Sequence, residues 1–166
     1  RNYDSLIQWK GKIYHIQNSV DMTEYDKISE TARTDELTRM LNRRGGSERL
    51  MRALEQGSRE NQVVTVVLYD INELKSVNDR YGHSEGDRLL QYVAAIAKEC
   101  LGRLDFMYRL SGDEFVMVFY GRDMKAADES MKRLLTRAGQ ERKRQLQEYD
   151  VSFSYGIAEV CPGDMG

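Results

Sequence analysis

The chain has 166 residues, of which 40% are hydrophobic and 31% are charged, so it suits one full domain with an extension. Its formal net charge of −2 excludes an electrostatic argument for nucleic acid or an anionic membrane as the partner. No stretch approaches the ~20 apolar residues of a membrane-spanning helix, which predicts no membrane contact for this segment.

The first predicted element is a pair of strands. Residues 7–20 mix aromatic and β-branched side chains around a turn at Lys10-Gly11-Lys12, which is typical of a hairpin. The pair is too short to form a domain of its own. Because the sequence begins with Arg1 instead of Met, we expect it to be a fragment of a longer protein.

A short linker helix is expected next, over residues 24–34. Thr23 is suited to cap its N-terminus. Tyr25, Ile28 and Ala32 share one face of this helix, as a coiled-coil linker requires. Roughly a dozen residues are marginal as a lone helix in water, so we expect this face to need a partner helix.

Beyond residue 34 the hydrophobic pattern alternates between the helix and strand periods. The predicted elements are, in order, a turn at Gly45-Gly46, a helix over 47–55, a polar loop over 57–61, a strand over 63–69, helices over 74–79 and 84–99, a hairpin over 106–120, a helix over 124–147 and a strand over 151–160. The order βααββαβ predicts an α/β sandwich with a mixed, largely antiparallel central sheet.

The central hairpin has Gly112 and Asp113 as its expected turn residues, because Gly adopts a positive φ without steric cost. Its tip carries two adjacent carboxylates, Asp113 and Glu114, and an isolated pair of this kind is more often a solvated turn. Here, however, the strand over 63–69 stops at Asp70, so two neighbouring strands end in carboxylates. Such strand ends suit divalent cations bound against the phosphates of a nucleotide.

Four motifs of the sequence resemble those of a known family. Ser-Gly-Asp-Glu-Phe at 111–115 resembles the Gly-Gly-Asp-Glu-Phe signature of GGDEF domains, the diguanylate cyclases. The other three matches are the segment 35–44 (DELTRMLNRR), the segment 70–79 (DINELKSVND) with Tyr81-Gly82-His83 and Gly86-Asp87 after it, and Ser154-Tyr155-Gly156. The motifs follow the family's order, so the chain is identified as a member. The resemblance implies the fold of nucleotidyl cyclases and polymerase palms.

The resemblance implies an enzyme, a diguanylate cyclase that condenses two GTP molecules into cyclic di-GMP and releases two pyrophosphates. It also implies Mg²⁺ (or Mn²⁺) as the cofactor and a homodimer as the active unit, because each domain holds one GTP. We expect the domain to be the output of a bacterial signalling protein under an upstream sensor. The alternative is a catalytically silent domain that binds GTP or cyclic di-GMP and regulates through contact.

The family's functional residues are carried over position by position. The resemblance implies metal ligands at Asp70, Asp113 and the main-chain carbonyl of Ile71, catalytic groups at Glu114, Asp113 and Lys75, and GTP contacts from Asn78, Asp87, His83, Lys75 and Gly112. Glu114 would activate the ribose 3′-hydroxyl and Lys75 would neutralise phosphate charge. Asn78 and Asp87 would recognise the edges of guanine.

Five of these residues also have a purely structural interpretation. The alternatives are a strand-terminating cap for Asp70, an exposed strand residue balanced by Arg109 for Glu114, a solvent-facing side chain for Lys75, a structural turn residue for His83 and a helix capping box at 84–87 for Asp87. A strand cap at Asp70 would not by itself predict a second carboxylate at Asp113, so the metal-binding interpretation is preferred.

Three departures from the family pattern favour the silent alternative or leave it open. Ser111 replaces the first Gly of the signature, and Asn72 stands where the family often has Asp, outside the expected ligands. After the strand over 151–160 the family continues into a helix and a strand. We therefore expect residues 35–166 to be a GGDEF domain without its C-terminal helix and strand.

The N-terminal segment ends with a resemblance to PAS sensor domains. Asp21-Met22-Thr23 matches their Asp-x-Thr junction, and an ordinary strand followed by a helix cap is the alternative. The expected organisation is a PAS-like remnant over 1–23, a linker helix over 24–34 and the GGDEF domain. Cys100 and Cys161 lack metal-ligand spacing, which indicates reduced thiols and a cytoplasmic domain in a protein that could be membrane-tethered.

Many GGDEF domains bind their product at an Arg-x-x-Asp site that ends six residues before the signature. Asp105 is present here, but Gly102 stands at the Arg position. Arg103 is adjacent, although one residue along a strand a side chain points to the opposite face. We therefore expect an incomplete inhibitory site, with Asp105 as a surface carboxylate and no tight product inhibition.

Overall fold

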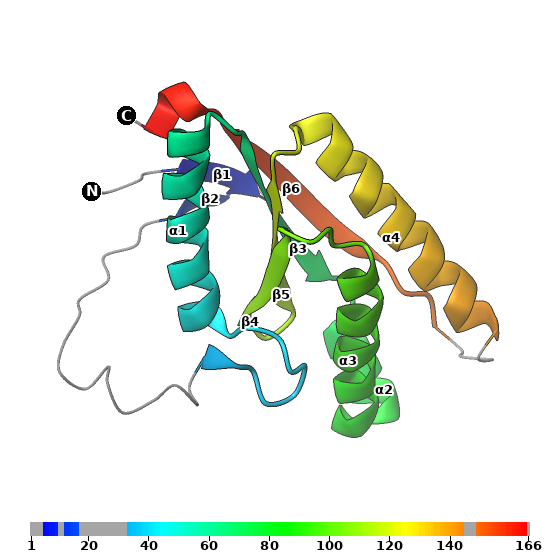
Figure 1. Cartoon of the computed structure of the whole chain (residues 1–166). Coiled ribbons are helices and arrows are strands. Elements are labelled where there is room, and N and C mark those ends of the chain that lie inside the picture. Colours follow the sequence, from blue (N-terminus) through cyan, green and yellow to red (C-terminus); the bar gives the residue numbers. More distant parts are fainter. Residues whose placement is uncertain (1–4, 10–11, 17–32, 145–148, 166) are drawn as a thin grey trace, which may run out of the picture.

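The computed structural model describes residues 5–9, 12–16, 33–144 and 149–165 (Figure 1). Its elements are β1 (Ser5–Trp9), β2 (Lys12–Ile16), α1 (Arg43–Glu60), β3 (Val64–Ile71), α2 (Leu74–Tyr81), α3 (His83–Glu99), β4 (Phe106–Ser111), β5 (Glu114–Tyr120), α4 (Met124–Arg144), β6 (Phe153–Val160) and the 3₁₀ turn η3 (Pro162–Met165). From β3 onward the order of strands and α-helices is the predicted βααββαβ.

The central sheet has four strands in the order β4-β5-β3-β6, and every neighbouring pair is antiparallel. The predicted α/β sandwich is therefore confirmed. Within the described residues the sheet is antiparallel throughout. The one parallel pairing is an isolated bridge between Leu41 and Tyr108, which attaches the segment before α1 to the outer edge of β4.

Helices cover both faces of the sheet, with α1 on one side and α3 and α4 on the other (Figure 1). Successive side chains of a strand point to opposite faces, so β3 serves two cores. Val66 and Leu68 pack with Leu50 and Leu54 of α1, whereas Val67 and Tyr69 pack with the α3 and α4 side. Because β3 is covered on both faces, it carries apolar residues at consecutive positions instead of an alternating pattern.

Helix α1 is longer than the predicted helix over 47–55, and the predicted turn at Gly45-Gly46 is wrong. Asn42 caps the helix by accepting a hydrogen bond from Gly45 N at 2.9 Å. A Cβ at Gly46 would lie 2.0 Å from the Tyr108 ring, and one at Gly45 would lie 2.7 Å from the Arg33 carbonyl oxygen. The two glycines are thus present because the helix start packs closely against β4 and the preceding segment. The predicted loop over 57–61 is likewise helical as far as Glu60.

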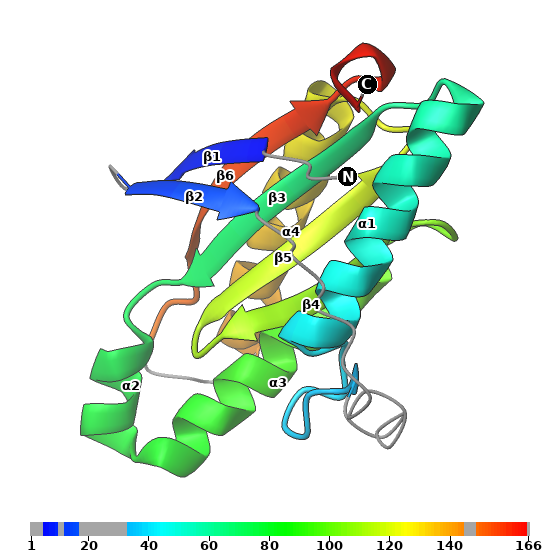
Figure 2. The same ribbon diagram turned by 90° about the vertical axis from the view of Figure 1, so that its left-hand side faces the viewer.

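The predicted N-terminal hairpin is confirmed, since β1 and β2 pair antiparallel with Trp9 opposite Lys12. Figures 1 and 2 show this hairpin on the α1 side of the sheet, and β1 contacts β6. The predicted linker helix lies outside the described residues as far as residue 32, so its Tyr25, Ile28 and Ala32 remain predictions. Its predicted last residue, Thr34, is not helical, because it pairs with Leu41 in an isolated antiparallel bridge. No helix of the described chain combines the length and apolar character needed to cross a membrane.

Candidate active site

Asp70 and Glu114 face each other at one end of the sheet. Asp70, near the end of β3, pairs with Glu114, the first residue of β5, and on its other side with Ser154 of β6. Strand alternation puts Asp70 on the same face as Val66 and Leu68, which is the α1 side. Directly opposite residues have Cβ atoms about 4.5–5.5 Å apart, so the two carboxylates are neighbours.

The hairpin turn is attached to the end of β3. Gly112 and Asp113 connect β4 to β5 as predicted, and Gly112 has a φ of 30°. The carbonyl oxygen of Asp113 accepts a hydrogen bond from Ile71 N at 3.2 Å. Asp113 is therefore held beside the residue that follows Asp70. On the strand side of the turn, the Ser111 hydroxyl donates to Glu114 Oε2 at 2.7 Å.

Arg109 stabilises this turn through hydrogen bonds. Its Nε and Nη2 donate to the Gly112 carbonyl oxygen at 2.9 and 2.7 Å, and its Nη1 lies 3.3 Å from both carboxylate oxygens of Asp35. Burial alone would raise the pKa of Asp35, but hydrogen bonds from Thr38 and the Arg109 guanidinium lower it below its usual range. Among the described residues Arg109 thus binds the turn carbonyl and Asp35, and not Glu114 as the structural alternative expected.

An aromatic cluster lies on the opposite face, beneath the two carboxylates. The rings of Tyr69 and Phe115 stack with centroids 5.3 Å apart, and Phe153 lies 5.9 Å from Tyr69. These residues directly adjoin Asp70, Glu114 and Ser154 in the three strands. Their packing fixes the backbone of all three strand ends. The side chains of Asp70, Glu114 and Ser154 on the opposite face are therefore attached to a rigid backbone.

Helices α2 and α3 carry the residues expected to bind nucleotide. The end of β3, the β4–β5 turn and these two helices lie at the same end of the molecule (Figure 2). Lys75, His83 and Asp87 are exposed, and Asn78 is half-buried. Asn78 packs tightly against α3, because a Cβ at Gly86 would lie only 1.8 Å from Asn78 Oδ1.

The capping-box alternative for Asp87 is wrong. Helix α3 begins at His83, and its N-cap is Gly82, which makes no side-chain capping hydrogen bond. Ser84 lies inside the first turn, and Glu85 Oε1 accepts a hydrogen bond from the Tyr149 hydroxyl at 2.8 Å. Asp87 therefore has no capping role, and its exposed carboxylate lies on the first part of α3.

The side chain of Asn72 has a structural role, because it forms hydrogen bonds with β6 and the residue before this strand. Its side-chain nitrogen donates to Ser152 Oγ at 3.0 Å, and its Oδ1 accepts from Ser154 Oγ at 2.7 Å. These contacts tie the chain after β3 to β6, and none of them is made with the other residues of the candidate site. The departure at Asn72 therefore has a structural explanation.

The donor set at the strand ends fits a hard divalent cation that is completed by a ligand. Among the described residues no three His, Cys, Asp or Glu side chains converge on one point. Asp70 and Asp113 offer two carboxylates, and the adjacent backbone offers carbonyl oxygens. Mg²⁺ is typically bound by one or two carboxylates together with substrate phosphates and water, so a partial protein site of this kind is suitable.

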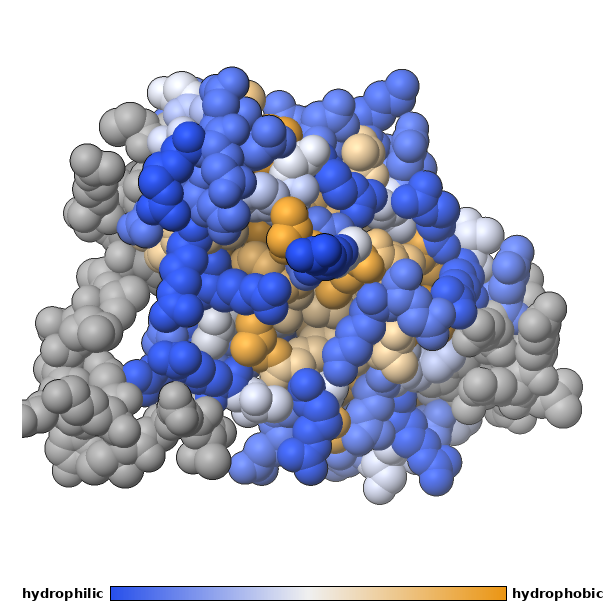
Figure 3. All heavy atoms as spheres, in the orientation of Figure 1, coloured by the Kyte–Doolittle hydropathy of each residue, from blue (hydrophilic) through white to orange (hydrophobic). Residues whose placement is uncertain are grey.

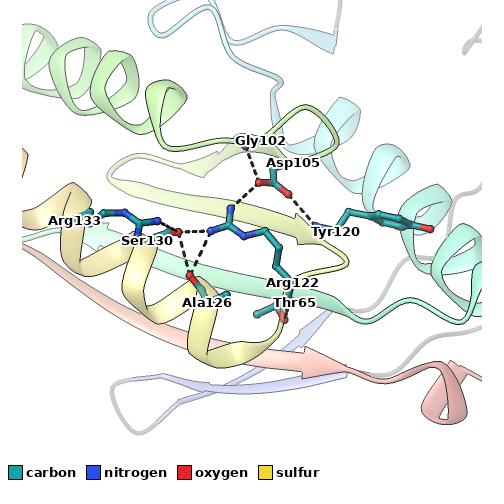
Figure 4. Close-up of polar contacts among 8 residues, drawn as sticks. All are labelled: Thr65, Gly102, Asp105, Tyr120, Arg122, Ala126, Ser130 and Arg133. Atoms are coloured by element: carbon teal, nitrogen blue, oxygen red, sulfur yellow. Dashed lines mark hydrogen bonds and ion pairs between the residues drawn. The ribbon is translucent and has the colours of Figure 1, made fainter.

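Asp105 is buried, so its prediction as a surface carboxylate is wrong. Its side chain is 3% exposed and accepts hydrogen bonds from Gly102 N at 2.7 Å, Tyr120 N at 3.0 Å and Arg122 Nη1 at 2.9 Å (Figure 4). Arg122 also donates to Ser130 on α4 and lies over the Phe119 ring at 4.6 Å. Asp105 thus joins the start of β4, the end of β5 and α4.

Sequence reasoning missed the supporting residues of the site. Arg109 and Asp35 are 74 positions apart, and Tyr149 and Glu85 are 64 apart. The motif segment 35–44 and the residues before the signature contain Asp35 and Arg109, but no local pattern links one to the other. Only the folded chain brings these pairs together.

Comparison with known proteins gives a consistent result. The family model described as "Diguanylate cyclase, GGDEF domain" matches residues 32–165. The chain is 35% identical over 138 residues to the bifunctional diguanylate cyclase/cyclic di-GMP phosphodiesterase MucR of Pseudomonas aeruginosa, which covers 83% of this chain and 20% of that protein. It is 29% identical over 145 residues to the diguanylate cyclase DgcS of Shewanella oneidensis, covering 87% and 48%. The chain thus spans about a fifth and about half of these two relatives.

The fold has close matches among solved structures. The crystal structure of the GGDEF domain of DgcB from Caulobacter crescentus, in complex with c-di-GMP, superimposes with a TM-score of 0.73. The two chains are 26% identical, and the match covers 82% of each. An antiparallel sheet with helices on both faces is therefore shared between this chain and a domain solved with the cyclic dinucleotide.

Proposed function

Because the chain belongs to the GGDEF family of diguanylate cyclases, we propose that it condenses two GTP molecules into cyclic di-GMP and two pyrophosphates. The observation that carries this proposal is the pairing of Asp70 with Glu114 beside the turn that holds Asp113. A solvated acidic turn has no need of a third carboxylate on a neighbouring strand. Phosphoryl transfer, by contrast, depends on positioned groups of this kind.

The proposed metal site consists of Asp70, Asp113 and the carbonyl of Ile71. Mg²⁺ (or Mn²⁺) bound there would neutralise charge on the triphosphate of GTP. The Asp113 carbonyl is engaged by Ile71 N, so the turn and the strand end would approach the ligand as one unit. The residues offer only part of a coordination shell, which is why the nucleotide itself is expected to complete it.

The proposed roles of the other residues follow from their chemistry. The Glu114 carboxylate would accept the proton of the ribose 3′-hydroxyl, and the exposed ammonium of Lys75 would neutralise phosphate charge. Asn78 and Asp87 would recognise guanine through an amide and a carboxylate, with His83 beside the ribose or a phosphate. A Cβ at Gly112 would meet nothing within 4 Å, so this backbone is open to a nucleotide.

The proposed active unit is a homodimer, because one site holds one GTP and the product contains two nucleotides. The upstream part of the protein is proposed to be a PAS-like sensor ending at residue 23, joined by the linker helix over 24–34. In this arrangement the domain over 35–166 is the output of a cytoplasmic signalling protein. The sensor would act by aligning two sites across the dimer.

The direct test is incubation of the protein with GTP and Mg²⁺, followed by chromatography for cyclic di-GMP. Asp70→Asn and Asp113→Asn should each abolish product formation while leaving the thermal melt unchanged. Unchanged turnover in either variant would contradict the proposal that its residue binds the metal ion. Glu36→Gln, a change of the same kind at an exposed residue, is the matched control.

The alternative function is a silent module that binds GTP or cyclic di-GMP. The observation that favours it is the Ser111 hydroxyl, which donates to Glu114, the residue proposed to accept the 3′-hydroxyl proton. Binding of GTP with no product at any protein concentration would select this alternative. Recovery of product formation in Ser111→Gly would then identify the hydroxyl as the cause.

A further inference from the structure

A groove of about 370 Å³ lies between α1 and the open end of the β4–β5 hairpin. Its lining includes Arg33, Arg49, Arg52, Leu104, Phe106 and Tyr120. Phe106 begins β4 and Tyr120 ends β5, whereas the candidate active site lies at the turn between these strands. At about 3.3 Å per residue, the length of β4 separates the two places by roughly 17 Å. The groove is therefore distinct from the active site.

The groove carries positive charge that the described residues do not neutralise. Arg49 and Arg52 are three residues apart on α1, so their side chains are neighbours on one face. Within the described part of the chain neither of them forms an ion pair. Arg33, at 3.1 Å, and Arg44, at 3.4 Å, share the single carboxylate of Glu48. An anion could therefore gain charge-assisted hydrogen bonds without breaking an existing ion pair of Arg49 or Arg52.

The floor of the groove is apolar and partly aromatic. Phe106 is almost fully buried, and Leu104 is 57% exposed, one of two large apolar side chains that stand out on the described surface. The guanidinium of Arg49 lies 4.5 Å from the centroid of the Phe106 ring. Figure 3 shows apolar surface in the middle of this face, flanked on the α1 side by hydrophilic side chains. A planar ring stacks well on an exposed guanidinium or against a leucine.

We propose that this groove binds a nucleoside polyphosphate, with its phosphates on Arg49 and Arg52 and its base against Leu104 and the Arg49 guanidinium. The volume lies in the range of small-molecule sites, and its combination of an apolar floor with a few charged groups is typical of them. An extended acidic peptide would use the arginines, but it would not need an aromatic floor or a concave shape. The lining offers few groups that could distinguish one base from another.

The proposal is tested with a fluorescent ATP analogue titrated into the whole protein. ATP is the probe because it lacks the guanine edges expected to engage Asn78 and Asp87. We expect saturable binding that weakens as salt rises, that falls at least tenfold in Arg49→Glu/Arg52→Glu and that persists in Asp87→Ala. Arg59→Glu, on the same helix but outside the groove, is the matched control and should bind like wild type. Arg49→Gln/Arg52→Gln provides a second variant if the charge reversal disturbs folding.

Two results would overturn the proposal. Binding that survives both arginine variants, or is lost in Asp87→Ala, would place the probe elsewhere. Inorganic tripolyphosphate that competes as strongly as ATP, together with unchanged ATP binding in Leu104→Asp, would show that no ring is held. Failure to produce cyclic di-GMP has no bearing on any of these measurements, so the groove and the proposed cyclase activity succeed or fail separately.

Discussion

The facing carboxylates of Asp70 and Glu114 depend on the register between β3 and β5. Because side chains alternate between faces, a slip of β3 by one residue would move Asp70 to the face of Phe115 and Phe153, among aromatic rings, and would carry Tyr69 to the opposite face. The stacked rings therefore do more than fill the core, since they penalise the wrong register. In this way the aromatic rings, which are structural, determine the face of the sheet on which the Asp70 carboxylate lies.

The hydroxyl group of Tyr69 is expected to lower the stability of the fold. This hydroxyl is buried, and among the described residues none lies within hydrogen-bonding distance; burial raises the pKa of Tyr69. A buried polar group without a partner costs about 1–3 kcal/mol, so Tyr69→Phe should raise the free energy of unfolding by ~1 kcal/mol or more. Thermal unfolding should move up by about 2–4 °C per kcal/mol. Tyr92→Phe, which removes a hydrogen bond to the Ala138 carbonyl at 2.8 Å, should do the opposite.

Gly86 is required by the side chain of Asn78. A methyl group there would lie 1.8 Å from Asn78 Oδ1, so Gly86→Ala must displace the amide proposed to contact guanine. We expect GTP affinity to fall about tenfold or more, measured by calorimetric titration. Gly139→Ala is the matched control, because its Cβ would meet nothing within 4 Å and alanine favours a helix. Equal GTP affinity in the Gly86 variant and in wild type would remove Asn78 from the proposed site.

Among the elements, the β4–β5 hairpin is held by a contact with another segment of the chain, the ion pair between Arg109 and Asp35, which we call the Asp35 clamp. Arg109 connects the Gly112 carbonyl to Asp35, which belongs to the segment before α1. The turn is thus held from two directions, by β3 through Ile71 and by this segment through the guanidinium. Its carboxylates accordingly have less freedom than those of an ordinary solvated turn.

The Asp35 clamp should make stability depend on pH. Hydrogen bonds from Thr38 and, after them, the Arg109 guanidinium lower the pKa of Asp35 in the folded protein, so these contacts stabilise it at pH values above the unfolded pKa of about 4 and are lost as pH falls through the folded value. Asp35→Asn should therefore lower the free energy of unfolding at pH 7, and the difference from wild type should shrink below about pH 4. Denaturant unfolding at several pH values measures this. A constant difference down to pH 2 would contradict the clamp, and exposed Glu36→Gln serves as the control.

The buried Asp105 predicts the absence of product inhibition. Its carboxylate is already bonded to Arg122 and two backbone N–H groups, so it is not available to a cyclic dinucleotide. Adding cyclic di-GMP should leave turnover unchanged. Gly102→Arg should not create inhibition either, because a Cβ there would lie 2.9 Å from Asp105 Oδ2 and the new side chain disturbs this network. Inhibition of wild type that Asp105→Asn relieves would show that the ion pair opens to the ligand.

These elements also show which parts of the fold and the site can be predicted from the sequence alone. The strands, the βααββαβ order, the turn at Gly112 and the facing carboxylates were predictable, because strand periodicity and turn chemistry are local. Helix α1 was predicted too short because Gly45-Gly46 is a turn signal by itself. Only the proximity of Tyr108 and Arg33 reveals why glycine is needed there. Asp105 was misplaced for a similar reason, since its partner Arg122 lies 17 residues away.

For the molecule as a whole, the proposed homodimer requires that two active sites meet. Because each site is proposed to hold one GTP, activity per protomer should rise steeply with protein concentration before it levels off. Ile28→Asp, on the predicted face of the linker helix and outside the described residues, should flatten that rise. Turnover assayed over a dilution series, with the oligomeric state followed by light scattering, gives the answer. Constant activity per protomer down to monomeric concentrations would contradict the dimer.

The central place of β3 has a consequence for synthesis. β3 ends at Ile71, but one of its two neighbours, β6, begins about 80 residues later at Phe153. At ~5–20 residues per second, a ribosome needs roughly 4–16 s to cover this distance. During that interval the nascent chain holds a hydrophobic strand with at least one edge unpaired, which is a template for association with other chains. Pausing of translation between the two strands should therefore increase aggregation more than pausing after Val160, when the sheet can close.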